Sequence, residues 1–391
     1  MTQDAILTHT ARTAYSRLVA WLGARSRDLA GAEDALSEAF AVALATWPRT
    51  GIPARPEAWL LTTARRRMID ASRRRGTARD AIPTLLLAME PEADDQAFPD
   101  DRLKLLFVCA HPAIDPAART PLMLQTVLGL DAATIAVAFL ATPAAMSQRL
   151  VRAKEKIRAA RIGFRIPAPE DLPERLDAVL QAIYAAYGTG WDAREAALEQ
   201  EAIWLARLLA ALLANKPETL GLLALLLFCD SRRAARRSPV GAFVPLAAQD
   251  PADWNTALLA EARALLIRAG AMNRPGRFQL EAAIQSVHAA RAETGRTDWP
   301  AIVLLYEGLI RIAPTIGLQV GRIAARAEAG NPAEALAALE GLPPAVSTYQ
   351  PYWALRAALL RRLDRPGEAT EATARALSLT TDPAIRDYLG R

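Results

Sequence analysis

The stretch DAATIAVAFLATPAAMSQRLVRAKEKIRAAR, residues 131–161, decides the fold that the sequence predicts. In its second half, apolar residues recur at spacings of three and four, which is the pattern of one face of an α-helix. These residues are Met146, Leu150, Ala153 and Ile157. A row of polar and basic residues lies beside them on the same helix: Gln148, Arg149, Arg152 and Lys156. We therefore expect an amphipathic helix with one basic flank.

This basic flank has two interpretations. A charged row on an amphipathic helix is usually solvated surface. The residues before it favour DNA binding, because residues 131–140 predict a short helix joined by a tight turn, with Ala136 small enough for a close crossing. In a helix-turn-helix domain the start of the second helix reaches bases in the major groove, and Gln and Arg suit adenine and guanine. Lys154 and Arg158 lie off this proposed face.

Composition predicts an all-α fold for the 391 residues. Ala, Leu and Arg dominate and favour helices, while β-branched residues never form the alternating runs of strands. Basic residues outnumber acidic ones by twelve to seven in residues 1–75 and by ten to three in residues 102–165. Between them, residues 76–101 carry one basic and seven acidic residues. This distribution indicates a polyanionic partner for the first part of the chain only.

The sequence also predicts a protein of a reducing compartment, with a cytoplasmic location. Its two cysteines, Cys109 and Cys229, are far apart, and the N-terminal residues lack the apolar segment of a secretory signal. The most apolar stretch, residues 220–229, is half the length of ~20 residues that a membrane-spanning helix needs. We therefore expect no membrane association.

Four parts follow from the pattern of helices and breaks. Residues 1–75 predict helices across 10–46, a Pro-rich break at 47–56 and a helix from Pro56. The second of these helices has an apolar stripe at helical spacing, formed by Leu29, Ala32, Leu36, Phe40 and Leu44. An acidic linker, 76–101, comes next, followed by three or four short helices in 102–164 and a helical extension in 165–391.

A repeat occurs near the C-terminus, in residues 314–385. GNPAEALAAL (330–339) aligns with DRPGEATEAT (364–373) at an offset of 34 residues. This is the period of tetratricopeptide repeats, which form grooves that bind proteins. The alternative is a plain helical hairpin packed on the rest of the chain.

Three segments resemble a known family when taken in order. AGAEDALSEAFAVAL, AWLLTTARRRMID and LGLDAATIAVAFLATPAAMSQRLVRAKEKIR resemble regions two and four of extracytoplasmic-function sigma factors. HPAIDPAARTPLMLQ and KIRAARIGFRIP resemble a subgroup with a long, tetratricopeptide-like C-terminal extension. The resemblance implies two small helical sigma domains and a larger helical domain. It also implies an alternative sigma factor that binds core RNA polymerase and promoter DNA and has no catalytic activity.

The resemblance also implies roles for individual residues. Those in the polymerase-docking helix are Glu33, Asp34, Glu38 and Phe40. Those at the −10 element follow the 47–56 loop and are Arg65, Arg66, Arg67, Arg73 and Arg74. The basic flank of 143–161 corresponds to the −35 recognition helix. The family often has Asn where this chain has Arg66, which bears on the identity of the flipped −10 base. Trp59 is expected in the core, with a base-stacking role as the alternative.

No catalytic residue, metal site or cofactor is predicted. Cys109 and His111 are close in sequence, but no second ligand pair follows, and no phosphate-binding or nucleophile motif occurs. The segment YAAYGTGW, 184–191, is expected to be a loop packed by its own aromatics or else a ligand pocket in the extension.

The sequence is also compatible with two other functions. One is a helix-turn-helix regulator that senses a signal or a protein partner through its repeats and acts without polymerase. The other is a helical scaffold whose basic face is solvated surface. In the sigma interpretation, the extension either inhibits or assists the sigma domains in cis.

Overall fold

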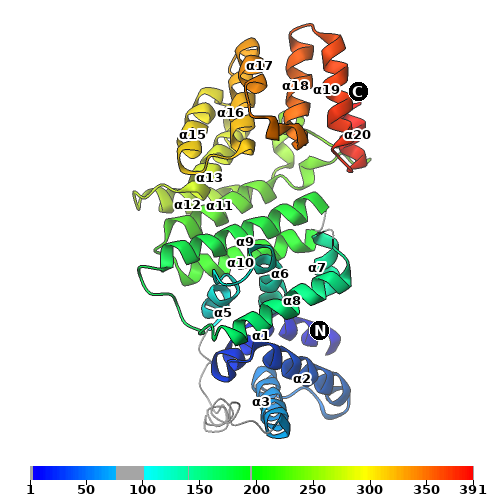
Figure 1. The fold of residues 1–391 in the computed structure, drawn as a ribbon, viewed down its shortest axis with the longest axis vertical. Helices are drawn as coiled ribbons and strands as arrows, with labels where there is room; N and C mark the ends of the chain where they lie inside the picture. Colours follow the sequence, from blue (N-terminus) through cyan, green and yellow to red (C-terminus); the bar gives the residue numbers. More distant parts are fainter. Residues whose placement is uncertain (1–2, 76–100, 140, 194–195, 391) are drawn as a thin grey trace. The chain divides into compact units, whose positions relative to one another are not determined.

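The computed structural model describes residues 3–75, 101–139, 141–193 and 196–390, and it confirms the all-α fold (Figure 1). Within those ranges no strand forms, and the backbone pairing of Arg237 with Phe243 is an isolated bridge. The predicted acidic linker lies outside the described residues except for Asp101. The chain divides into two compact units, Met1–Leu205 and Ala206–Arg391, which are described separately.

The helices of the first unit, with α10 continuing into the second, are α1 (Gln3–Ser26), α2 (Leu29–Thr50), α3 (Pro56–Arg75), α5 (Arg102–Cys109), α6 (Pro116–Leu128), α7 (Ala132–Ala138), α8 (Pro143–Ala159), α9 (Leu172–Ala193) and α10 (Ala196–Leu212). The α-helices of the second unit are α11 (Pro217–Ser231), α12 (Thr256–Gly270), α13 (Arg277–Ala289), α14 (Arg291–Thr294), α15 (Trp299–Ile312), α16 (Ile316–Glu328), α17 (Pro332–Glu340), α18 (Gln350–Arg362), α19 (Pro366–Ser378) and α20 (Pro383–Leu389). Short 3-10 turns occur at Ala234–Arg236, Leu246–Ala248, Pro251–Asp253 and Pro344–Thr348.

Helix α2 packs against both α1 and α3. Its first turn is capped by Asp28, whose carboxylate accepts a hydrogen bond from the Gly31 N–H. Near its end the fully buried Trp47 meets the half-buried Trp59 of α3 edge-on, with ring centroids 5.4 Å apart. Trp59 therefore contributes to packing, as the core interpretation expects.

The break predicted at residues 47–56 begins later than expected. Helix α2 continues through Pro48 to Thr50, since burial of Trp47 holds this last turn against α3. Gly51 ends it with a φ of 83°, a conformation that costs glycine little.

The apolar stripe predicted along α2 is wrong in its second half. Leu29, Ala32 and Leu36 are buried, but Leu44 is 56% exposed. A spacing of four residues advances about 40° per step around a helix of 3.6 residues per turn, so the stripe rotates away from the core. The core side of the later turns is formed by Ala39, Ala43 and Trp47 instead.

Helices α5 and α6 form the centre of the first unit and pack against α1. Cys109 on α5 and Thr126 on α6 are buried, and Sγ lies 3.2 Å from the threonine Oγ1. At the start of α5, the buried Asp101 carboxylate pairs with Arg25 of α1 at 3.3 Å and with Lys104 at 2.5 Å. The one described residue of the predicted linker is therefore fixed to α1.

Helix α9 differs from its prediction. The sequence predicts a break near Gly188–Gly190, but the helix continues to Ala193. It packs on α5 and α6, and Arg175 near its start donates a hydrogen bond of 2.9 Å to the Phe107 carbonyl. The first compact unit thus includes α9, which sequence pattern assigns to the extension beginning at residue 165.

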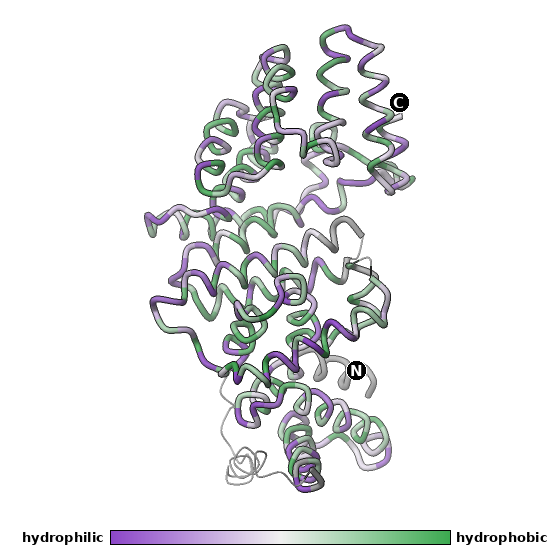
Figure 2. The backbone as a smooth tube through the Cα atoms, viewed as in Figure 1, coloured by the Kyte–Doolittle hydropathy of each residue, from purple (hydrophilic) through white to green (hydrophobic). Residues whose placement is uncertain are grey.

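The second unit is built around α11, which is buried on all sides and packs against α12 and α13. Its apolar character is visible along the α11 tube in Figure 2. The Glu218 carboxylate on α11 accepts hydrogen bonds from the backbone N–H groups of Phe278 and Gln279, and so caps α13.

Two helix pairs follow the predicted repeat. Helices α16 and α18 begin 34 residues apart, as do α17 and α19. The equivalent Ala335 and Ala369 are both buried where adjacent helices pack. Figure 1 shows the four helices side by side in its orange and red part. The period therefore corresponds to a helical hairpin, and its assignment as tetratricopeptide-like stays a prediction.

Helices that could span a bilayer, judged by length and apolarity together, are not found in the described part of the chain.

Gly129, directly after α6, tests the left-handed turn that ends this helix. Gly129 has a φ of 71°, and a Cβ there would lie 3.2 Å from the Tyr15 ring. We predict that Gly129→Ala lowers the free energy of unfolding by about 1–2 kcal/mol because it forces a left-handed conformation on alanine. Urea unfolding measures this change. Gly188→Ala is the control, because nothing lies within 4 Å of the new Cβ, and it should leave the free energy of unfolding unchanged or raise it. If Gly129→Ala also leaves the free energy of unfolding unchanged, the left-handed conformation of Gly129 is contradicted.

Candidate nucleic-acid interface

Helices α7 and α8 pack against each other across a short turn. Asp131 precedes α7, and its carboxylate accepts hydrogen bonds from the Thr134 N–H at 2.8 Å and from the Thr134 hydroxyl at 3.1 Å. These bonds lower the pKa of Asp131, the backbone one most strongly. Thr142 caps α8 by accepting from the Ala145 N–H, and Pro143 suits the first helical turn. Both helix starts are therefore locally determined.

The predicted faces of α8 are confirmed for its apolar side. Met146, Leu150, Ala153 and Ile157 are all buried. Gln148, Arg152 and Lys156 are exposed and Arg149 is half-buried. Arg152 Nη2 donates to Gln148 Oε1 at 3.4 Å, which places the two side chains next to each other on the surface. The helix thus presents the polar and basic row that the sequence predicts.

Lys154, on the other flank of α8, has a different partner. Its ammonium forms an ion pair with Glu33 of α2, and the two side chains are only 14% and 7% exposed. Glu33 Oε1 has no hydrogen-bond partner among the described residues. Burial raises the pKa of Glu33, and the charge of Lys154 opposes that rise. This pair is the buried electrostatic contact between the helix with the basic row and α2.

The residues expected at the polymerase surface divide into two groups. Asp34 and Glu38 are exposed, and Phe40 is half-buried. Glu33 is not on the surface, because its carboxylate is enclosed against Lys154. In this conformation Glu33 cannot contact a partner protein, which corrects the position implied for it by the resemblance.

Helix α3 carries the arginines expected at the −10 element. Arg66, Arg67 and Arg73 are exposed and Arg65 is half-buried. Arg74 lies in α3, but its side chain is outside the described residues. Arg67 Nε lies 3.5 Å from Glu38, which links the basic face of α3 to the exposed side of α2.

Catalytic or metal chemistry has little support in the described residues. They contain no group of three or more His, Cys, Asp or Glu side chains positioned to hold a metal ion. Burial raises the pKa of the Cys109 thiol to about 12, so it is protonated at neutral pH and a poor nucleophile. Burial, together with Arg232 and Arg291, lowers the pKa of His288 to about 4.

Residues 11–77, which include most of α1 and all of α2 and α3, match sigma-70 region 2. The chain carries a sigma-70 region 2 domain. This domain indicates a sigma-70 family factor, a non-enzymatic class of protein with a role in transcription initiation, which implies binding to core RNA polymerase and promoter DNA.

Two further comparisons concern the rest of the chain. Residues 175–270 match a family of unknown function, DUF6596. The chain is 39% identical over 377 residues to uncharacterized protein R00370 of Rhizobium meliloti (strain 1021), an alignment that covers 93% of this chain and 89% of that protein. The chain therefore belongs to one family with R00370 along nearly its whole length. No solved structure matches it.

Sequence reasoning did not find the Glu33–Lys154 pair. The helical wheel separates Lys154 from the basic row, which is a signal that it faces something else. The partner could not be identified, because Glu33 lies 121 positions earlier in the chain and only tertiary packing brings the two side chains together.

Removal of one partner tests this ion pair. We predict that Lys154→Met lowers the free energy of unfolding at pH 7 by about 3 kcal/mol, because it leaves a buried carboxylate without its cation. Urea unfolding at several pH values measures the change. Since burial raises the pKa of Glu33 in the folded state, the folded protein binds that proton more tightly than the unfolded chain does. The deficit should therefore be largest above the folded-state pKa and shrink as the pH falls through it.

The double variant Glu33→Gln with Lys154→Met is the control for this prediction. It removes both charges and should recover much of the lost stability. A Lys154→Met variant as stable as the wild type at pH 7 would show that the pair does not hold α8 to α2.

Proposed function

We propose that the chain is an alternative sigma factor of the extracytoplasmic-function type, which binds core RNA polymerase and directs promoter-specific initiation. The observation that carries this proposal is the match of residues 11–77 to sigma-70 region 2. Three surfaces of the described residues support it: the exposed face of α2, the arginines of α3 and the basic row of α8.

The exposed face of α2 is the proposed polymerase-docking surface. Leu44 is 56% exposed there, on the same helix as the exposed acids Asp34 and Glu38. Phe40 is half-buried one turn before Leu44. A helix that exposes both an apolar side chain and acidic ones suits a protein interface, where apolar contacts supply affinity and charges supply orientation.

The basic face of α3 is the proposed site of −10 recognition. Arg65, Arg66, Arg67 and Arg73 lie along the described part of α3, and Arg74 follows in the same helix. Cationic surfaces of this kind follow the backbone of single-stranded DNA. Trp59 packs edge-on against Trp47, so its role here is to support α3.

Helices α7 and α8 are proposed to form a helix-turn-helix that reads the −35 element. Gln148 and Arg149 would contact base edges near the start of α8, and Arg152 and Lys156 would hold phosphates and bases further along. Burial of the apolar side supports this assignment, because it fixes which side of α8 can enter a major groove.

The extension is proposed to regulate or support these domains in cis, with its tetratricopeptide-like hairpins taking a protein partner. Helix α9 packs on α5 and α6, so removal of all residues after 165 would uncover the sides of α5 and α6 on which α9 packs. Loss of activity on such a truncation would therefore mix loss of regulation with loss of packing. Point variants in the second unit separate the two.

The second candidate is a helix-turn-helix regulator that acts without polymerase. The α7–α8 arrangement supports it as well, because a helix-turn-helix can bind duplex DNA without polymerase. The two functions differ in their dependence on core RNA polymerase.

The DNA-reading face is tested by matched arginine variants. We predict that Arg152→Ala weakens promoter binding in the complex with core polymerase by about 1–3 kcal/mol, because it removes a base or phosphate contact. Arg158→Ala, an exposed arginine on the opposite flank of α8, is the control and should change binding little. Fluorescence anisotropy over a range of salt measures both. An equal loss at Arg158 would contradict the assignment of faces.

The polymerase-docking surface is tested by a charge at its apolar centre. We predict that Leu44→Glu weakens binding to core RNA polymerase at least about tenfold, because it buries an unpaired charge in the interface. Leu304→Glu, at the 68% exposed Leu304 of the second unit, is the control. Equal binding by Leu44→Glu and the wild type would exclude this face of α2.

A further inference from the structure

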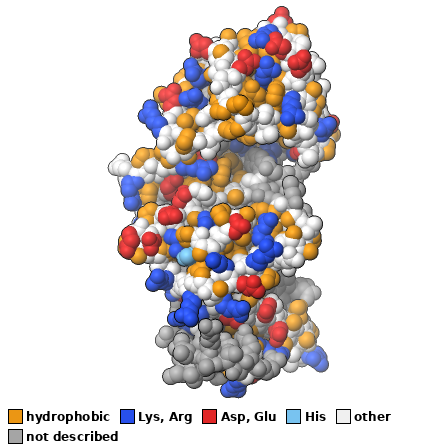
Figure 3. Space-filling view, in the orientation of Figure 1, with side chains coloured by type: hydrophobic (Ala, Val, Ile, Leu, Met, Phe, Trp, Pro, Cys, Tyr) orange, Lys and Arg blue, Asp and Glu red, His pale blue; other side chains and the backbone are white. Residues whose placement is uncertain are grey.

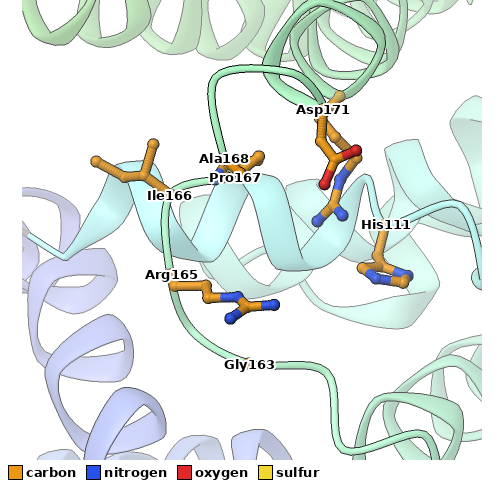
Figure 4. Close-up of a pocket in the computed structure, with 8 residues that line it drawn as sticks. His111, Gly163, Arg165, Ile166, Pro167, Ala168 and Asp171 are labelled. Carbon is orange, nitrogen blue, oxygen red and sulfur yellow. The ribbon is translucent and has the colours of Figure 1, made fainter.

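A cavity of about 250 Å³ lies beside the segment that connects α8 to α9. It is lined by His111 from the α5–α6 loop, by Gly163–Ala168 without Phe164, and by Asp171 and Arg175. Figure 4 shows the side chains of Arg165, His111 and Asp171 around this hollow, carried by the connecting segment, the α5–α6 loop and the approach to α9. An adjoining hollow of about 190 Å³ shares Arg175 and adds Arg119.

Two arginines, Arg165 and Arg175, and one acid, Asp171, line this cavity. Neither arginine forms an ion pair within the described residues. Burial lowers the pKa of Arg175; the charges of Asp171 and Glu174 oppose this change, and those of Arg119 and Arg165 add to it. Guanidinium groups held close together without a direct ion pair are a common property of sites that bind anions.

One hydrogen bond holds the Arg175 guanidinium in place, and the group has further N–H donors. Its Nη2 donates to the Phe107 carbonyl at 2.9 Å, while its Nε is buried and has no hydrogen-bond partner among the described residues. A buried donor of a charged group that lacks an acceptor is costly. An oxyanion in the cavity would accept from the guanidinium N–H groups of Arg175 that line it.

His111 adds a donor of defined position. Its Nδ1 accepts a hydrogen bond from the Ala113 N–H at 3.1 Å. Partial burial, together with the charges of Arg175 and Arg119, lowers the pKa of His111. Because Nδ1 accepts from Ala113, the ring carries its proton on Nε2. The lining therefore offers two guanidinium groups and one imidazole N–H, together with one carboxylate, that of Asp171. Figure 3 shows basic and acidic side chains close together around a pale blue histidine on the face in view.

We propose that this cavity binds a small phosphate-type oxyanion, either inorganic phosphate or the terminal phosphate of a small organic molecule. The bound anion bridges Arg165 on the connecting segment to Arg175 on α9 and to His111 in the α5–α6 loop. Phe164 in the same segment packs against Gly23 of α1, and Ile162 is buried directly after α8. A bound oxyanion therefore holds in place the segment that follows α8. This site goes beyond the proposed sigma function.

Arg165→Gln is the variant that tests the site. Arg165 is exposed, so the substitution should leave the fold intact. Isothermal titration calorimetry of the full chain with inorganic phosphate, at constant ionic strength in chloride, should give saturable one-to-one binding. Arg165→Gln should weaken it at least about tenfold, because it removes a charge-assisted hydrogen bond. Arg161→Gln, exposed in the same segment but outside the cavity lining, is the matched control and should bind as the wild type does.

Each outcome of this experiment is decisive. Competition by phenyl phosphate assigns the site to a phosphate carried by an organic ligand, and binding of inorganic phosphate alone assigns it to the free ion. The absence of saturable phosphate binding to the wild type, or an equal loss in Arg161→Gln, overturns the proposal. A loss of duplex DNA affinity in Arg165→Gln without any phosphate binding also overturns it, and assigns the arginine to the DNA backbone. None of these measurements involves polymerase, so their failure is distinct from failure of the proposed sigma function.

Discussion

The Lys154–Glu33 ion pair is the contact on which the arrangement of the first unit depends. It joins α8, whose other flank carries the basic row, to α2, which lies in the sigma-70 region 2 domain. Removal of one charge alone leaves the other buried and unpaired at a large cost, so the two side chains depend on each other. Two further contacts join α1 to other helices of this unit. Tyr15 lies against Gly129 at the end of α6, and Arg25 forms an ion pair with Asp101 at the start of α5.

The Lys154–Glu33 pair gives α8 three separate sides. One side is apolar and buried, a second presents Gln148, Arg152 and Lys156 to solvent, and the third uses Lys154 to hold α2. The division explains how so basic a helix can be both part of a packed unit and a candidate DNA-reading surface. It also removes Glu33 from the set of residues that can contact polymerase in this conformation, and leaves Asp34, Glu38 and Leu44 on the exposed face of α2.

Much of the fold could be predicted from the sequence because its signals are local. The apolar side of α8 depends on residues three and four apart, and the hairpin offset of 34 residues is visible by alignment. The errors occur where packing over longer distances decides. The helical spacing predicts Leu44 in the core, but it lies on the exposed side of α2. Gly188 predicts a break, but α9 continues through it. The cavity at Arg165, Arg175 and His111 joins three separate segments, and no periodicity in the sequence indicates it.

The central claim is that this chain gives promoter specificity to core RNA polymerase, and in vitro transcription tests it most directly. Purified core polymerase is combined with the full chain on a pool of genomic DNA fragments, and transcript starts are mapped with and without the chain. The account predicts new starts that share upstream −10 and −35 sequences and that require both proteins. Tight, sequence-specific duplex binding by the chain alone, with no chain-dependent transcripts, would contradict it and favour a regulator that acts without being a sigma subunit.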